Sequence, residues 1–324
     1  MGGLVLTVGE GLGVLQPSGG GSLEAGDASV STGGAEGNVA VGLARLGTPV
    51  RWAGRVGRDG IGRRVTGSLR REGVEVVAFE DAQAPTAFLV KESPAPGRTV
   101  VSYYRTACAG SRLSVDDVAS LPLDDVAVIH VTGITLALSD SASAAIDALV
   151  QRARDNGALV SFDVNHRARL WGERDASAAY RRLAARSDIV FAGDDEAALL
   201  VGGTPEQMLE GIAAWGASEV VLKRGVQGAL ALIDGDLHRR AAVAVDVVDT
   251  VGAGDAFVAG YLAERLRGAD AQSRLRLATL CGAAACRAPG DWEGAATRDE
   301  AVTIERAAAG RSPAQDDSGD PVIR

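Results

Sequence analysis

A glycine-rich turn followed by an aspartate, near the C-terminal end of the chain, has the residue types needed to act on an anion. The segment reads DTVGAGDAFVAGYLAERL over residues 249–266, where a turn is followed by the apolar spacing of a helix. Free amides at a helix start, together with the helix dipole, form an anion site, and here they belong to Gly252, Ala253, Gly254 and Asp255. The carboxylate of Asp255 could then remove a proton from a hydroxyl that attacks a phosphate. A simple capping role for Asp255 is the alternative.

Other phosphate-binding motifs do not occur in this sequence. The pattern G-x-x-x-x-G-K-[ST] is absent. The stretch GEGLGV, residues 9–14, comes close to a dinucleotide-binding fingerprint, but Val14 stands where the third glycine is required and no helical pattern follows. We interpret this stretch as a loop on the substrate side of the site.

The string DTVGAGDAFVAGYL resembles the C-terminal signature of the ribokinase-like sugar kinases, also called the PfkB family. The resemblance implies that Asp255 is the catalytic base and that Gly252, Ala253 and Gly254 stabilise the transferring phosphoryl group. It also implies ATP as the donor and Mg²⁺ to offset the charge on its phosphates. The implied fold is α/β, ribokinase-like and three-layered, with a mostly parallel central sheet and a small β lid.

Two further segments extend the resemblance along the chain. GGAEGNVAVGLARLG, residues 33–47, is similar to the N-terminal signature, in which a diglycine lets the backbone approach the sugar; the implied sugar-binding residues are Gly33, Gly34 and Asn38. VLKRGVQGAL, residues 221–230, resembles the strand, turn and strand before the nucleotide site, and the implied neighbours of ATP are Lys223, Gly225 and Gly228. For Lys223 alone, a solvated surface charge is an equal alternative.

The metal-binding pattern of the family is altered in this chain. The family has an N-x-x-E motif that organises magnesium through water, and here Gly193 replaces the asparagine while Glu196 remains as the implied magnesium residue. Asp194 or Asp195 could compensate, or they could favour a helix N-terminus. The resemblance also implies a monovalent cation, such as K⁺, near Asp249.

Four segments resemble the 2-keto-3-deoxygluconate kinases in particular. They are YYRTACAGSRLS, HVTGITLALS, SFDVNHRARLW and GDWEGAATRDE, which begin at residues 103, 130, 161 and 290. A sugar acid carries a carboxylate, and Arg105 and Arg167 could each give it paired donors. The implied substrate-binding residues are Tyr103, Arg105, Asn165 and Arg167. For either arginine alone, a surface salt bridge is the alternative.

Three other functions stay open beside this leading hypothesis, which is ATP-dependent phosphorylation of 2-keto-3-deoxygluconate to 2-keto-3-deoxy-6-phosphogluconate. The nearest is a kinase of a neutral sugar, a fructokinase or ribokinase, against which the two arginines argue. A nucleoside kinase would need a base-stacking pocket, and only 4% of the residues are aromatic. A non-catalytic sugar or nucleotide sensor would not need Asp255, although Gly193 keeps that hypothesis open.

Short β-rich runs alternating with helical patterns must position these residues. Apolar runs predict strands at 4–8, 50–53, 74–79, 126–131, 159–164, 189–192 and 220–223, with another β-like run at 243–248. Strands joined by crossover helices imply a mostly parallel sheet. Two β-like runs at 86–91 and 99–104 predict a small separate sheet, which is a natural lid over a site. Asp234-Gly235 indicates a late hairpin.

We therefore predict one kinase domain over residues 1–306, with lid segments near 10–35 and 85–106. The small, polar residues from 307 to 324 predict a disordered tail. An exposed lid sheet would favour a homo-oligomer formed through its edge strands.

Composition excludes several classes of partner. The 324 residues carry a formal net charge of -9, with a pI near 5.0, so nucleic acid and anionic membranes are not expected partners. We see no targeting signal or membrane-spanning run, which makes the cytoplasm the expected location. Three cysteines do not form a disulfide framework. The expected partners are small molecules, namely a sugar or sugar acid and ATP.

Overall fold

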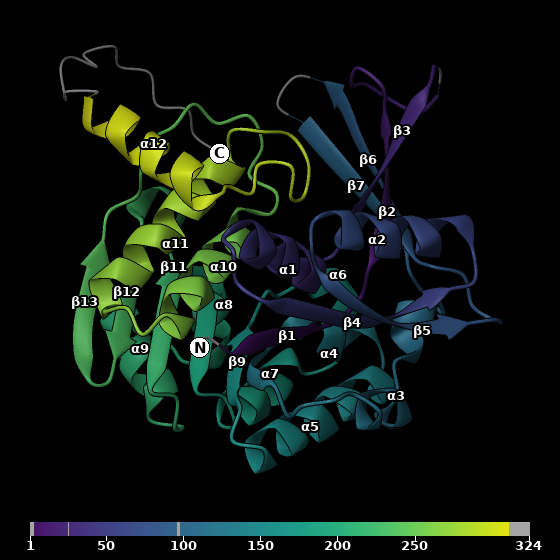
Figure 1. The fold of residues 1–324 in the computed structure, drawn as a ribbon. Helices are drawn as coiled ribbons and strands as arrows, with labels where there is room; N and C mark the ends of the chain where they lie inside the picture. The colour runs from purple at the N-terminus through teal and green to yellow at the C-terminus, as the bar shows by residue number, and fades with distance from the viewer. Residues whose placement is uncertain (1–2, 25, 96–97, 311–324) are drawn as a thin grey trace.

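A nine-stranded sheet forms the centre of the computed structural model, which describes residues 3–24, 26–95 and 98–310 (Figure 1). Its strands are β1 (Leu4–Val8), β4 (Val50–Gly57), β5 (Glu75–Asp81), β8 (Val126–Thr132), β9 (Leu159–Asp163), β10 (Ile189–Gly193), β11 (Glu219–Lys223), β12 (Ala229–Ile233) and β13 (Asp236–Arg240). The spatial order is β13-β12-β11-β10-β9-β8-β1-β4-β5. Neighbours from β11 to β5 pair in parallel, and β12 and β13 add an antiparallel hairpin at one edge. The predicted mostly parallel sheet and the hairpin at Asp234-Gly235 are confirmed.

Helices cover both faces of this sheet because its strands are apolar on both sides. The helices are α1 (Ala35–Arg45), α2 (Gly60–Arg71), α3 (Val115–Ala119), α4 (Gly133–Leu138), α5 (Asp140–Asp155), α6 (Ala168–Trp171), α7 (Ala176–Ala184), α8 (Asp194–Leu200), α9 (Pro205–Ala213), α10 (Ala253–Leu266), α11 (Ala271–Ala285) and α12 (Arg298–Gly310). Successive strand residues point to opposite faces. Val5 and Val128 pack with α1, α10 and α11, whereas Leu6 and Ile129 pack with α5 and α7. The three predicted layers are therefore present.

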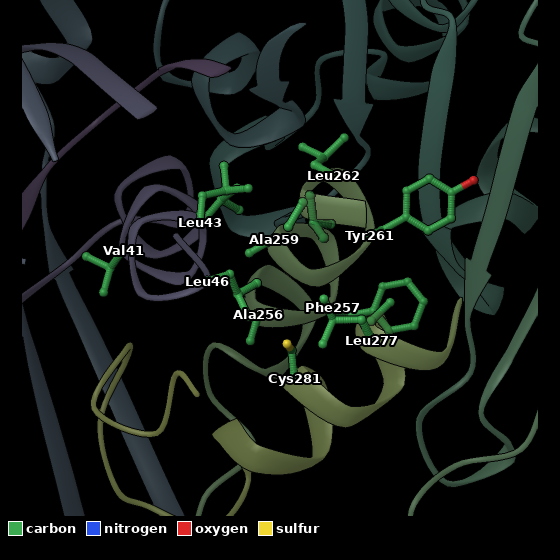
Figure 2. Close-up of a cluster of buried hydrophobic side chains, with 14 of the residues drawn as sticks. Val41, Leu43, Leu46, Ala256, Phe257, Ala259, Tyr261, Leu262, Leu277 and Cys281 are labelled. Carbon is green, nitrogen blue, oxygen red and sulfur yellow. The ribbon is translucent and has the colours of Figure 1, made fainter. Parts of the chain in front are cut away.

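The contact between α1 and α10 determines where two functional side chains meet. Figure 2 shows Leu43 and Leu46 pointing toward α10, with Leu43 near Ala259 and Leu46 near Ala256. A Cβ added to Gly42 of α1 would lie 2.7 Å from the Cβ of Ala259, so the two helices approach closely there. This packing brings the N-terminal turns of α1 and α10 together.

A four-stranded sheet, which we call the lid sheet, stands beside the large sheet (Figure 1). Its order is β3-β2-β6-β7, from β2 (Leu12–Pro17), β3 (Ala28–Gly33), β6 (Phe88–Ala95) and β7 (Arg98–Tyr104). It has a small core of its own, formed by Leu12, Val14, Ala87, Leu89 and Cys108. The predicted lid sheet is thus present. The stretch at 9–14, which we interpreted as a loop, is a loop only at residues 9–11, because residues 12–14 form the start of β2 and pair with β3.

Two further sequence predictions differ from the structure. The β-like run at 243–248 forms no strand, and Val247 and Val248 are exposed; without a strand partner, its β propensity is not expressed. The tail predicted to be disordered from 307 begins as helix, because α12 continues to Gly310 and is anchored by buried Ala301 and Ile304. The remainder, residues 311–324, lies outside the described residues.

Candidate active site

A cavity of about 400 Å³ lies between the lid sheet and the C-terminal ends of several strands of the large sheet. The ends of parallel strands are the usual place for a ligand in an open α/β sheet. Residues that follow β1, β9 and β10 line it, as do β11, the N-terminal turns of α1 and α10, and the lid strands. The lining residues used below are Glu10, Gly34, Glu36, Asn38, Lys91, Tyr103, Arg105, Asn165, Arg167, Gly193, Glu196, Lys223, Gly252, Gly254, Asp255 and Asp291.

The carboxylate of Asp255 is buried and is held by two amide side chains. Asn38 Nδ2 donates to Asp255 Oδ2 at 2.7 Å, and Asn165 Nδ2 donates to Oδ1 at 3.4 Å. Burial raises the pKa of Asp255, although the hydrogen bond from Asn38 and the charge of Lys223 act in the opposite direction. A carboxylate oriented in this way, with a raised proton affinity, can accept a proton from a hydroxyl in the cavity.

The glycine-rich turn before Asp255 offers backbone amides to the cavity. Gly252 is the N-cap of α10 with φ 74°, and a Cβ there would lie 1.9 Å from the carbonyl oxygen of Asp291. Ala253 N donates to Thr250 O at 3.3 Å, so it is used within the turn. The amides of Gly254 and Asp255 follow in the first helical turn, where no intrahelical acceptor is available. These two amides and the helix dipole can bind an anion.

Lys223 places a positive charge beside this turn. Its Nζ donates to both carboxylate oxygens of Asp163, at 2.7 and 2.6 Å. A Cβ added to Gly254 would lie 3.4 Å from the same Nζ. Burial alone would lower the pKa of Lys223, but Asp163, Glu196 and Asp255 raise it overall, so the ammonium stays charged. The ammonium therefore lies next to the amides that can bind an anion.

The diglycine at the start of α1 allows two close backbone approaches. Gly34 has φ 132°, and a Cβ there would lie 2.2 Å from Glu10 O. A Cβ on Gly33 would lie 1.7 Å from Asp291 Oδ2. Only Gly34 of the pair lines the cavity. Burial, together with repulsion from Asp255, raises the pKa of Asp291 to about 7.

On the lid side, Arg105 is already paired with a carboxylate. Its Nε donates to Glu10 Oε2 at 3.0 Å and its Nη2 contacts the same oxygen. The guanidinium lies over the ring of Tyr103, with 5.0 Å between Cζ and the ring centroid. Among the described residues, Glu10 Oε1 has no hydrogen-bond partner, and burial raises the pKa of Glu10 against the effect of Arg105. Glu10 thus cancels part of the charge that Arg105 could offer a ligand.

Arg167, in contrast, is exposed to the cavity mouth. It follows β9, and its Nη1 donates to the carbonyl oxygen of His166 at 2.9 Å. Among the described residues, no carboxylate lies within salt-bridge distance of Arg167, so its guanidinium can bind an incoming anion.

Glu196 links two strand ends through backbone hydrogen bonds. Its Oε1 accepts from His166 N at 2.8 Å and its Oε2 accepts from Gly193 N at 2.7 Å. Asp194, which might have replaced the missing asparagine, instead pairs with Arg224 at 3.1 Å. The described part of the chain contains no cluster of three or more His, Cys, Asp or Glu side chains that could hold a metal directly.

The cavity brings together most of the residues singled out from the sequence. Gly34, Asn38, Tyr103, Arg105, Asn165, Arg167, Glu196, Lys223, Gly252, Gly254 and Asp255 all line it. Gly33, Ala253, Gly225, Gly228 and Asp249 do not. Gly225 and Gly228 lie on the turn after β11, where φ values of 52° and 85° account for glycine.

Sequence reasoning missed five charged residues of this region, namely Glu10, Glu36, Lys91, Asp163 and Asp291. Glu36 Oε1 accepts from Thr132 Oγ1 and Thr135 Oγ1, both at 2.7 Å, and burial raises the pKa of Glu36 to about 7. All five stood inside segments already noted, with Lys91 at the end of the β-like run 86–91, and a charged residue within an otherwise apolar or glycine-rich string was the available signal.

Comparison with known proteins places the chain in a family. Residues 10–298 match the family described as pfkB family carbohydrate kinase. The chain is 35% identical over 276 residues to a 2-dehydro-3-deoxygluconokinase of Bacillus subtilis, with 84% of this chain and 85% of that protein covered. It is 33% identical over 248 residues to a 2-dehydro-3-deoxygalactonokinase of Haloferax volcanii, covering 75% and 78%.

Solved structures agree with this assignment. A protein from Escherichia coli assigned as a ribokinase II, in complex with ATP and Mg²⁺, superposes with a TM-score of 0.86 at 27% identity, covering 94% of this chain and 99% of that one. The predicted ribokinase-like fold is confirmed. The chain belongs to the pfkB family of carbohydrate kinases and is therefore a sugar kinase, a phosphotransferase with an alcohol group as acceptor.

Proposed function

We propose that the protein transfers the γ-phosphoryl group of ATP to 2-keto-3-deoxygluconate, forming 2-keto-3-deoxy-6-phosphogluconate. One observation carries the proposal. A single cavity holds the buried carboxylate of Asp255, the open amides of the turn before it, and the two arginines Arg105 and Arg167. A base and an anion site suit phosphoryl transfer, and the arginines suit a substrate that carries a carboxylate. The 2-dehydro-3-deoxygluconokinase among the relatives supports this choice.

In the proposed reaction, Asp255 takes the proton from the sugar hydroxyl as that oxygen attacks the γ-phosphorus. Asn38 and Asn165 orient its two carboxylate oxygens. The amides of Gly254 and Asp255 then bind the oxygens of the transferring group, and the ammonium of Lys223 adds charge on the same side. Positioning and charge stabilisation of this kind account for most of the catalysis in phosphoryl transfer.

The proposed acceptor binds between the lid sheet and the diglycine turn. Gly34 lets the backbone approach the sugar, Gly33 makes room beside it for the side chain of Asp291, and Tyr103 covers the sugar from the lid. Arg167 is free to form charge-assisted hydrogen bonds with the carboxylate of the sugar acid. Arg105 can contribute only through donors that Glu10 does not occupy. Arg167 is therefore the stronger of the two determinants.

We propose ATP and Mg²⁺ as the cosubstrate and metal. Each carboxylate oxygen of Glu196 accepts one hydrogen bond from a backbone amide. An ionised carboxylate oxygen can accept a second hydrogen bond, so Glu196 can also hold a water molecule bound to Mg²⁺. The metal would offset phosphate charge. Lys223 is the proposed phosphate neighbour, with Gly225 and Gly228 on the turn beside the nucleotide. The structure in complex with ATP and Mg²⁺ supports both ligands.

A neutral-sugar kinase is the second candidate, and one observation favours it. Glu10 pairs with Arg105 in a buried position, so a neutral sugar would meet less uncompensated positive charge than the sequence suggested. The 2-dehydro-3-deoxygalactonokinase among the relatives makes the epimeric keto-acid a further acceptor to compare.

We also propose a homo-oligomer formed through the lid sheets and a cytoplasmic location. β3 and β7 are the outer strands of the lid sheet. Tyr104 at the end of β7 stacks on Phe88, with 4.7 Å between ring centroids, and is 54% exposed. A contact with a second copy would bury this aromatic pair. No helix among the described residues has the length and apolar composition needed to cross a membrane.

Steady-state ATP consumption by the purified protein tests the acceptor. The panel is 2-keto-3-deoxygluconate, its galactonate epimer, fructose and ribose, each with Mg²⁺-ATP. We expect the highest kcat/KM with a keto-acid. A preference for fructose or ribose would establish the neutral-sugar kinase instead. If none of the four acceptors supports ATP consumption, the non-catalytic sensor becomes the better hypothesis.

A further inference from the structure

A lysine of the lid sheet is paired with the aspartate that precedes the glycine-rich turn. Lys91 lies on β6, and its Nζ donates to Asp249 Oδ2 at 2.5 Å. The two side chains are 14% and 18% exposed, so the pair is largely shielded from water. The residues are 158 positions apart in the chain, and they join the lid sheet to the start of α10.

Asp249 connects two segments that shape the anion site. Its Oδ1 accepts from Val251 N at 3.2 Å, and its Oδ2 accepts from Gly290 N at 3.4 Å. Val251 belongs to the turn itself. Gly290 precedes Asp291, whose carbonyl oxygen packs against Gly252. The carboxylate of Asp249 therefore fixes the turn relative to the neighbouring loop, and it needs a positive partner there.

That positive partner is Lys91 in this structure. Burial alone would raise the pKa of Asp249, but the hydrogen bond from Lys91 and the amide of Val251 lower it, so the carboxyl is ionised. The charge of Lys91 also acts on Asp291, where it opposes the rise in pKa. The ammonium of Lys91 thus favours the ionised form of two carboxylates beside the turn, those of Asp249 and Asp291.

Lysine is rare in this chain, and both of its occurrences lie at the cavity. The chain has 33 basic residues, of which only Lys91 and Lys223 are lysines, and both line the cavity. Both donate to a largely buried aspartate, Asp249 and Asp163 respectively. An ammonium is a compact point charge, like an alkali cation, whereas a guanidinium is a planar fork. A point charge is therefore used at both places next to the proposed phosphate site, and arginine everywhere else.

We propose that the ammonium of Lys91 takes the place of the monovalent cation at Asp249, so that phosphoryl transfer by this protein requires no free K⁺. The K⁺ expected near Asp249 does not fit, because Oδ2 already accepts from an ammonium and both oxygens accept from backbone amides. The charge is carried by the lid sheet, which through this contact is joined to the segment before α10. Lys91 is a positioning residue, which acts on the turn through Asp249.

The inference rests on the proposed phosphoryl transfer, and its test compares cation responses. Wild type and Lys91→Met are assayed with Mg²⁺-ATP and the best acceptor, in 0 to 100 mM KCl with tetramethylammonium chloride keeping ionic strength constant. We expect wild-type kcat/KM to change less than about twofold across the series. Without K⁺, Lys91→Met should lose about 10- to 100-fold, because an ionised carboxylate is left unpaired. K⁺ or methylammonium should restore part of that loss.

Two further variants separate a cation role from a purely structural one. Lys91→Met combined with Asp249→Asn removes both charges, so it should show no response to K⁺. Arg58→Met breaks an exposed ion pair with Glu80 elsewhere, and it should behave as wild type.

Melting temperature provides a readout that does not depend on turnover. We expect K⁺ to raise the melting temperature of Lys91→Met but not that of wild type or the double variant. This measurement still tests the inference if the acceptor proves to be a different sugar. Activation of wild type by K⁺ would overturn the proposal. A Lys91→Met protein that is folded but unaffected by K⁺ and methylammonium, in activity and in melting, would do so equally.

Discussion

The two walls of the cavity hold their charged side chains in different ways. On the wall built by α1, α10 and the segment after β9, which we call the first wall, Asp255 is buried against the neutral amides of Asn38 and Asn165. On the lid wall, Lys91 and Arg105 each donate to a carboxylate. Neutral partners orient Asp255 without cancelling its charge, whereas ionic partners leave the lid almost neutral. We infer that the first wall performs proton and phosphoryl transfer and, through Arg167, binds the carboxylate of the acceptor, and that the lid wall covers the acceptor.

The strongest test of this division is Asp255→Asn, on the first wall. The variant keeps the shape of the side chain but cannot take up a proton, so kcat should fall by about 10²- to 10⁴-fold. ATP affinity, measured by calorimetry, and melting temperature should stay near wild type. Asp155→Asn, at an exposed position in α5, is the matched control. Near-normal turnover by Asp255→Asn would remove this residue from the mechanism.

Gly254→Val tests the anion site on the same wall. A side chain there would enter the space beside Lys223 Nζ and the free amides, so we expect kcat to fall by about 10²- to 10³-fold, as for the loss of an oxyanion donor. The backbone of Gly254 is helical, which means that the melting temperature should hardly change. Gly67→Val, within α2, is a control for the general cost of valine in a helix. Equal turnover by wild type and Gly254→Val would contradict the assignment.

Glu36 offers a test through pH, because its neutral form is favoured in the folded chain. Its pKa is raised to about 7 from an ordinary value of 4.5, so its contribution to stability is complete below pH 4.5 and is lost as the pH rises to about 7. Glu36→Gln keeps an acceptor for Thr132 and Thr135 but cannot ionise. Between pH 4.5 and 8, the free energy of unfolding of wild type should fall by about 3 kcal/mol more than that of Glu36→Gln.

Urea denaturation at several pH values measures this difference. Asp291, whose pKa is also raised to about 7, should leave a pH dependence of similar size in the variant. If both proteins lose stability in parallel, the first wall does not hold Glu36 in its neutral form.

The two arginines that face the acceptor, Arg105 on the lid wall and Arg167 after β9, should show the smallest effects, and these should depend on the acceptor. Arg167→Ala should lower kcat/KM for 2-keto-3-deoxygluconate by about 10- to 100-fold while changing turnover of fructose far less, since fructose has no carboxylate. Arg105→Ala should show less selectivity and a lower melting temperature, because it leaves Glu10 buried without a partner. Glu10→Gln combined with Arg105→Met should recover part of that stability. Equal loss on both acceptors for Arg167→Ala would contradict the role of this arginine in acceptor choice.

Local features of the sequence were sufficient to predict the first wall. The turn before Asp255 and the start of α1 are each contained in about fifteen consecutive residues, and glycine positions report backbone geometry directly. Alternating β and helical patterns also predicted the order of the elements. The run at 243–248 misled because β propensity needs a neighbouring strand, which that segment lacks.

The lid wall could not be predicted in the same way. Arg105 was identified, but its partner Glu10 is 95 positions away, and nothing local indicates that the two meet. Asp249 was assigned to a monovalent cation, and its pairing with Lys91 could not be predicted, since Lys91 lies in a different segment of the chain. Charge balance in a folded site depends on pairs brought together by the tertiary structure, so residue type alone overstates the free charge.

The scarcity of lysine has a consequence for handling the protein. A protease that cleaves only after lysine has two targets in the whole chain, and it would give the fragments 1–91, 92–223 and 224–324. Both targets are held in strands, and both side chains line the cavity. Lys91 pairs with Val101 in the lid sheet, so cleavage after residue 91 requires the lid sheet to unfold locally, while cleavage after residue 223 requires the large sheet to do so. The ratio of the two cuts under native conditions therefore compares the local stability of the two sheets without any label.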